Sequence, residues 1–174
     1  MKKRTLYVCA AVIVVLFAAV GFLAGKSIFA RKATITILHV NDTHSQLEPV
    51  RSGEYAGMGG ELERAAYIDS VRRADGPENV LVLHAGDYFQ GSAYFSEFGG
   101  SVEVQAMNAV KYDAVTLGNH KFDNGIEALG ERLASLECPV VVCNYDFSPF
   151  EAGKYIKPCV VVCTQYGRDR GGIK

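Results

Sequence analysis

Three apolar, β-branched runs shape this chain, and each of them ends abruptly in polar residues. The runs cover residues 33–40, 80–85 and 112–117. Between them, residues 61–74 and 101–110 carry apolar side chains at helical spacing. Strands that alternate with helices are typical of an α/β fold, in which helices cover a mostly parallel sheet.

The same alternation continues toward the end of the sequence. Apolar spacing predicts a further helix near 125–136 and strands near 139–144 and 156–164. The last residues, GRDRGGIK, resemble a turn that leads into another strand. We therefore expect the chain to be shortened, as the front part of a larger domain.

The N-terminal segment has a different composition. Residues 6–25 contain no charge and directly follow the basic residues at positions 2–4. About twenty apolar residues can span a bilayer, so the segment fits an uncleaved membrane anchor or a cleaved export signal. Residues 1–33 are expected to be this signal or transmembrane anchor plus a linker. Residues 34–174 would then form an exported body in the cell envelope, either periplasmic or membrane-anchored.

The expected body is acidic, although the whole chain has a net charge of only −1. Six of the 18 basic residues and none of the 19 acidic ones lie within residues 1–33, so residues 34–174 have a net charge of −7. A nucleic acid polymer requires a basic surface and is therefore excluded as a partner. A small phosphate ester remains compatible if bound cations supply the positive charge.

Metal-competent side chains follow each of the three best strands. Sites in open α/β sheets form beyond the carboxyl ends of the strands, so these side chains should converge at one edge. Any one of them alone would be an ordinary turn or helix-cap residue. Together, carboxylate, imidazole and amide groups suit divalent ions such as Mn, Zn, Fe, Co or Mg. The clusters are Asp42-Thr-His44, Gly86-Asp87 and Gly118-Asn119-His120.

The segments HVNDTHS, AGDYFQGS and LGNHKFDNG resemble the calcineurin-like metallophosphoesterases. The similarity is greatest to the branch of exported 5′-nucleotidases and 2′,3′-cyclic-nucleotide phosphodiesterases, and it covers only the N-terminal part of that family's domain, from about residue 34 to 174. The resemblance implies a metallophosphoesterase-type β-sandwich flanked by helices, here truncated and preceded by an N-terminal hydrophobic helix. It also implies a hydrolase of nucleotide catabolism.

The resemblance further implies a dinuclear metal centre, with two divalent ions. Asp42 and His44 would bind the first ion, Asp87 would bridge both, and Asn119 would bind the second. A metal-bound hydroxide would attack the phosphate ester, for which nucleotides are the expected substrates.

The same resemblance assigns roles in substrate binding and proton transfer. Asn119 and His120 would contact the substrate phosphate. His120 would also protonate the leaving oxygen, and Asp123 would orient the His120 imidazole. His120 and Asp123 are therefore the expected catalytic residues.

Two residues depart from the family pattern. Lys121 stands where the family usually has Glu, and we expect it to point into solvent. His84 stands where Asp is common, and we expect it to be buried in its strand. The family completes its site with further histidines, but no histidine follows His120 in this sequence.

These departures leave other interpretations open. The chain could be a truncated or degenerate phosphatase remnant without catalytic activity, or a relative of the thiosulfohydrolases. An active site would need a missing C-terminal half or a partner subunit to supply the remaining ligands.

Overall fold

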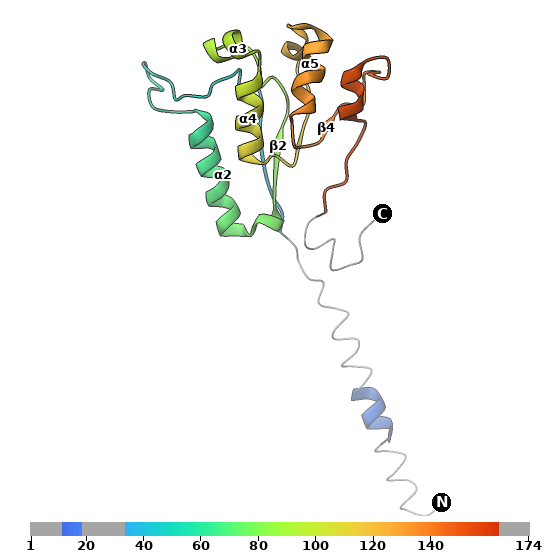
Figure 1. Ribbon diagram of the computed structural model, residues 1–174. Coiled ribbons are helices and arrows are strands. Elements are labelled where there is room, and N and C mark those ends of the chain that lie inside the picture. The colour runs from blue at the N-terminus through green and yellow to red at the C-terminus, as the bar shows by residue number, and fades with distance from the viewer. Residues whose placement is uncertain (1–11, 19–33, 164–174) are drawn as a thin grey trace, which may run out of the picture. The chain divides into compact units, whose positions relative to one another are not determined.

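The computed structural model describes residues 12–18 and 34–163 (Figure 1). The chain divides into two units, Met1–Thr34 and Ile35–Lys174. In the first unit residues 12–18 are helical, and the rest of the apolar stretch 6–25 lies outside the described residues. None of the described helices is long and apolar enough to cross a membrane. The signal or anchor stays a prediction.

A five-stranded parallel sheet forms the centre of the second unit. Its strands follow one another across the sheet in chain order. β1 and β2 pair in a register that sets Val40 opposite His84, so both strands end at the same edge. This arrangement confirms the predicted α/β fold. The strands are β1 (Thr36–Val40), β2 (Val80–His84), β3 (Ala114–Val115), β4 (Val140–Val141) and β5 (Ile156–Lys157).

The described helices of this unit agree with the apolar periodicity, with one addition. The predicted helices at 61–74 and 101–110 are present almost to the residue, and the one near 125–136 ends two residues early. The additional helix has six residues, which is too few for a periodic signal. The helices are α2 (Glu61–Asp75), α3 (Ala93–Phe98), α4 (Ser101–Val110) and α5 (Gly125–Ala134), with short 3₁₀ turns η1 (Pro77–Asn79), η2 (Asn119–Phe122) and η3 (Glu151–Tyr155).

The third strand is shorter than the apolar run 112–117 suggests. The chain enters it from Lys111, which ends α4 in a left-handed conformation with φ 60°. Ladder hydrogen bonds nevertheless extend beyond the strand: the N–H groups of Asp113 and Thr116 donate to carbonyls of β2 at 2.8 and 3.0 Å. These bonds keep the chain beside β2 up to its last residue, so Gly118 follows close to the end of β2.

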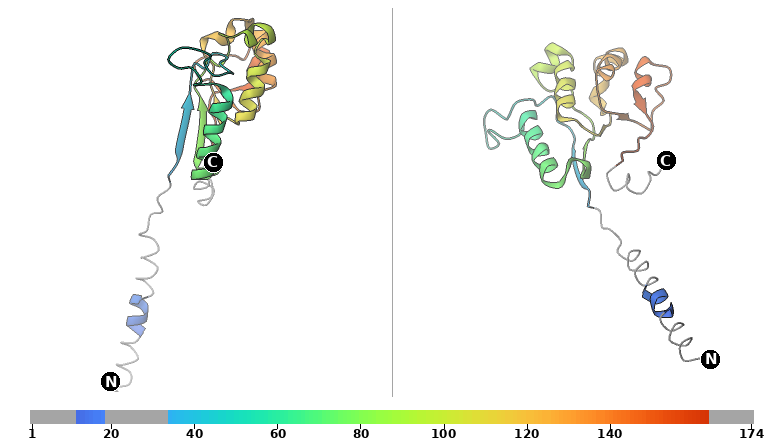
Figure 2. Two further views of the ribbon diagram at one scale, coloured as in Figure 1. Left: turned by 90° about the vertical axis from the view of Figure 1, so that its left-hand side faces the viewer. Right: turned by 60° about the horizontal axis from the view of Figure 1, so that its bottom comes forward.

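The core lies between the sheet and the helices on one of its faces. The left view of Figure 2 shows β1 and β2 on one side and α2 and α4 on the other. Buried side chains from both layers meet there, among them Ile68, Met107, Leu129, Val82 and Val140. The opposite face is open, and Ile37 on β1 is 60% exposed. The described residues thus form one sheet, and the second sheet of a sandwich stays a prediction.

Candidate metal centre

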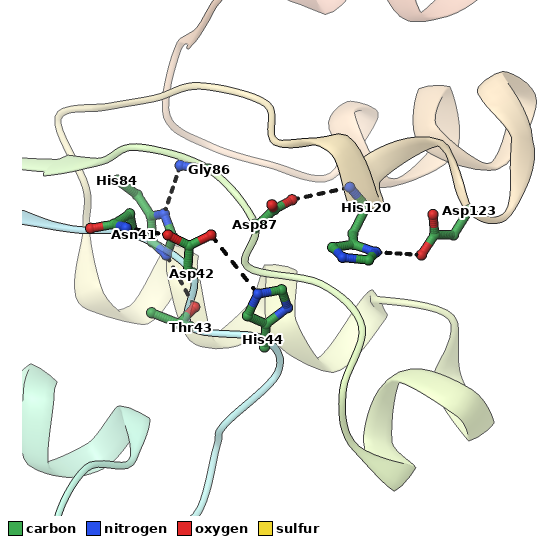
Figure 3. A network of polar contacts seen from close by, with 9 residues as sticks. All are labelled: Asn41, Asp42, Thr43, His44, His84, Gly86, Asp87, His120 and Asp123. Atoms are coloured by element: carbon green, nitrogen blue, oxygen red, sulfur yellow. Dashed lines mark hydrogen bonds and ion pairs between the residues drawn. The ribbon is translucent and has the colours of Figure 1, made fainter.

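The loops after β1 and β2 bring three of the predicted ligands together. The backbone N–H of Asp42 donates to the Gly86 carbonyl, and that of His44 donates to the Asp87 carbonyl, both at 3.0 Å. One potential ligand atom from each of Asp42, His44 and Asp87 lies within 4.8 Å of the other two. Figure 3 shows these side chains facing one another. The predicted convergence at the strand ends is therefore present.

The backbone of these loops is strained at the candidate ligands. Asp42, His44 and Asp87 have φ angles of 52°, 43° and 50°, and Ser45 follows with 57°. The left-handed region costs a residue other than glycine roughly 1–2 kcal/mol. Such strain persists where the surrounding structure enforces it, and it gathers at functional sites. Aspartate and histidine adopt this conformation more often than most residues other than glycine, but four such residues in two adjacent loops are more than residue type alone predicts.

The chemistry of the three donors fits a divalent cation. They supply two carboxylates and one imidazole, and only Asp87 is buried, with 7% exposure. A cation would offset the repulsion between the two carboxylates. These oxygen and nitrogen donors suit Mn, Fe, Co or Zn. Asp87 Oδ1 already accepts a hydrogen bond from the His120 N–H at 3.1 Å, which fixes its orientation.

The 3₁₀ turn η2 presents the remaining predicted residues. Asn119 is exposed at its first position, and His120 follows half-buried. The Nδ1 atom of His120 lies 2.8 Å from Asp123 Oδ2, so this nitrogen carries the proton that Asp123 accepts and Nε2 is left for another partner. The rings of His120 and His44 lie 5.3 Å apart. The structure thus places His120 and Asp123 beside the candidate ligands.

His84 is buried beneath this site, as the sequence predicts, with 2% exposure. The Gly86 N–H donates to its Nδ1 at 3.2 Å. Nδ1 therefore accepts, and Nε2–H is left to donate to Thr43 Oγ1 at 3.1 Å. Burial, followed by the positive charges of Arg64 and Lys121, lowers the pKa of His84 to about 4.

This lowered pKa predicts an acid-sensitive fold. The unfolded chain takes up a proton near pH 6.5 and the folded chain only near pH 4, so His84 stabilises the fold fully above pH 6.5 and progressively less down to pH 4. The loss amounts to about 3 kcal/mol. His84→Asn should unfold in urea with a smaller stability difference between pH 7.5 and 4.5 than the wild type. The exposed control His39→Asn should retain the full difference, and an unchanged difference in His84→Asn would contradict this explanation.

Lys121 does not point into solvent, so that expectation is wrong. The residue is 3% exposed, and its Nζ lies 3.6 Å from the centre of the Tyr88 ring and 4.1 Å from that of Phe89. The long apolar stem of lysine packs well in such surroundings, and aromatic faces attract the ammonium. Burial lowers its pKa to about 7, while nearby carboxylates, led by Asp87, oppose that shift.

Sequence reasoning missed a buried polar group behind the ligands. Glu103 on α4 is 2% exposed and accepts a hydrogen bond from Ser45 Oγ. A signal was available, because Glu103 shares a helix face with Met107 and Val110 at four- and seven-residue spacing. A carboxylate on an apolar face is rarely buried without a specific partner.

Two carboxylates and an imidazole at the carboxyl ends of parallel strands form a candidate divalent-metal site in an α/β domain. The calcineurin-like phosphoesterase family matches residues 35–173. The chain belongs to this family, whose members are hydrolases.

Individual relatives agree with this assignment. The NAD 5′-nucleotidase of Haemophilus influenzae is 38% identical over 152 residues, which cover 83% of this chain and 25% of that protein. The human 5′-nucleotidase is 43% identical over 117 residues, covering 63% and 20%. The crystal structure of a 5′-nucleotidase precursor from Thermus thermophilus matches with a TM-score of 0.64 and 39% identity, covering 74% and 26%. The chain thus spans about a quarter or less of these relatives.

Proposed function

We propose that this chain forms the metal-binding front part of an exported phosphoesterase that hydrolyses nucleotides. The observation that carries the proposal is the meeting of Asp42, His44 and Asp87 at the ends of β1 and β2. The hydrogen-bonded pair of His120 and Asp123 beside them supports it.

In this proposal Asp42, His44, Asp87 and Asn119 would hold two divalent ions. When bound, the ions supply positive charge for the phosphate oxygens and make water a stronger nucleophile at neutral pH. Asp87, to which the family resemblance assigns contact with both ions, is buried, and the His120 N–H orients its Oδ1.

His120 is the proposed proton donor. Its Nδ1 is engaged by Asp123, which holds the ring in one orientation. Protonated His120 can then give its Nε2 proton to the leaving oxygen as the phosphorus–oxygen bond breaks. A donor in this position converts the leaving alkoxide into a neutral alcohol.

A nucleotide is the proposed substrate because the similar proteins are named 5′-nucleotidases. The acidic body, with its net charge of −7 over residues 34–174, is compatible with an anionic substrate when metal ions bind the phosphate. The proposed location is the cell envelope, with residues 6–25 as export signal or anchor.

A non-catalytic remnant is the rival proposal, and the buried position of Lys121 favours it. A positive charge at this site opposes the binding of divalent cations. Lys121 is close enough to the proposed ligand Asp87 that this carboxylate, more than any other, raises the pKa of Lys121. The remaining ligands would also have to come from further chain or a partner subunit.

Release of phosphate from adenosine 5′-monophosphate tests the two proposals, and it is measured on the chain together with the further segment or partner subunit that supplies the remaining ligands. We expect release with Mn²⁺, none with EDTA, and recovery when Mn²⁺ is restored. His120→Asn should lower the rate roughly 10²- to 10⁴-fold while Mn²⁺ binding persists, and the exposed control His39→Asn should match the wild type. Equal rates for the wild type and His120→Asn would support the remnant.

A further inference from the structure

A hydrogen-bond chain, buried at Ser45 and Glu103 and half-buried at Ser92, joins the two ligand-bearing loops to helix α4. Ser45 directly follows the proposed ligand His44, and its Oγ donates to Glu103 Oε1. Ser92, from the loop that begins at Asp87, has its Oγ 2.5 Å from Ser45 Oγ. The Ser45 hydroxyl has one proton, which it donates to Glu103, so the Ser92 hydroxyl donates to Ser45.

Ser45 depends on these contacts for its conformation. Its φ of 57° directly follows the φ of 43° at His44, and two consecutive left-handed residues other than glycine are costly. The Ser45 N–H donates to the Tyr88 carbonyl at 3.2 Å, and its side chain donates to Glu103. One bond holds the backbone of this turn and the other holds its side chain, so together they fix the direction in which His44 projects.

Glu103 occupies a place where an apolar residue would otherwise be expected. Its neighbours on the buried face of α4 include Val104 and Met107, and Glu103 itself is 2% exposed. Burial of a carboxylate is unfavourable for folding unless its hydrogen bonds compensate. A buried carboxylate that contacts the ligand-bearing turn has a role there that packing alone does not explain.

We infer that Glu103 is a positioning residue of the metal centre, acting through Ser45 and Ser92 to hold His44 beside the other two ligands. The inference rests on the proposed function, because it requires that these ligands bind metal. Groups that orient metal ligands in this way typically change metal affinity 10- to 100-fold when they are removed.

Glu103→Met and Glu103→Gln separate positioning from simple packing. Methionine keeps the length of the side chain and removes both the charge and the acceptor. The protein should stay folded in EDTA, because methionine fills a similar volume and the Ser45 hydroxyl keeps Ser92 as a hydrogen-bond partner, yet its Mn²⁺ affinity should fall roughly 10- to 100-fold. Glutamine keeps an oxygen that Ser45 can reach, so most of the affinity should return. Gln105→Met, at an exposed position of the same helix, is the matched control.

The measurement is a titration of the full 174-residue chain with Mn²⁺, in which electron paramagnetic resonance follows the free ion and thermal unfolding in EDTA follows the fold. Ser45→Ala should weaken binding similarly, and the double variant with Glu103→Met should be hardly weaker than either single one, since both changes break the same chain.

Three results would overturn the inference. Glu103→Met could bind Mn²⁺ as tightly as the wild type, which leaves the proposed function intact. Both Glu103 variants could unfold in EDTA, which would make the residue structural. The wild type itself could bind no Mn²⁺, and this result alone would also remove the proposed function.

Discussion

Replacement of Asp87 by asparagine is expected to weaken Mn²⁺ binding by more than roughly 100-fold. This loss exceeds the roughly 10- to 100-fold loss that follows when a group that only orients a ligand is removed. Asp87 is the buried member of the three candidate ligands. Asparagine has nearly the same shape and still offers an oxygen to the His120 N–H, but it removes one of the two negative charges that would hold the ion.

The fold should survive this change. Asparagine relieves the repulsion between Asp87 and Asp42, but it also removes a carboxylate that acts on the buried Lys121. These two effects oppose each other, so the melting temperature in EDTA should change little. Electron paramagnetic resonance of free Mn²⁺ measures the affinity, and Asp69→Asn on the exposed side of α2 is the control. Wild-type affinity in Asp87→Asn would mean that the ion binds elsewhere in the chain.

Replacement of Gly118 by alanine is expected to damage both the fold and the site. The backbone of Gly118 is extended, with φ −97°, so any residue could adopt it. The obstacle is a steric clash, because an added Cβ would overlap Asp87 Oδ1 and approach the Asp87 nitrogen to 2.6 Å. Asp87 would have to turn away from His44 and Asp42. We expect the loss of Mn²⁺ binding and a destabilisation of about 1–3 kcal/mol, as for overpacking.

Gly130→Ala is the matched control for this experiment. Gly130 lies within α5, and an added Cβ there would meet its nearest atom, the Ala152 nitrogen, at 3.4 Å. Alanine favours the helix by up to about 1 kcal/mol, so this variant should be at least as stable as the wild type and should bind Mn²⁺ normally. Urea unfolding in EDTA gives the stabilities. Normal Mn²⁺ binding by Gly118→Ala would show that the loop with Gly118 is not packed against Asp87 as described.

The parallel sheet and three of its helices could be predicted because their signals are local and repeated. Apolar spacing located helix α4 at residues 101–110, and the β-branched runs located β1 and β2. The meeting of Asp42, His44 and Asp87 followed from a general property of parallel sheets, whose strands present their carboxyl ends at one edge. The order and register of the strands bring the separate motifs together in one candidate site.

The features that could not be predicted depend on contacts between distant segments. The left-handed conformations of Asp42 and His44 arise from hydrogen bonds to the loop after β2. Lys121 was expected in solvent because a lone lysine is usually exposed, but the rings of Tyr88 and Phe89 provide a place for it. Charge type alone cannot reveal such a pocket.

An anomalous diffraction map of crystals of the full chain grown with Mn²⁺ tests the central claim most directly. The proposed function predicts a manganese peak between the side chains of Asp42, His44 and Asp87, within about 2–2.5 Å of their ligand atoms. It also predicts that the peak is absent from crystals of Asp87→Asn. A map with no peak among these three residues, or with manganese bound elsewhere, would contradict it.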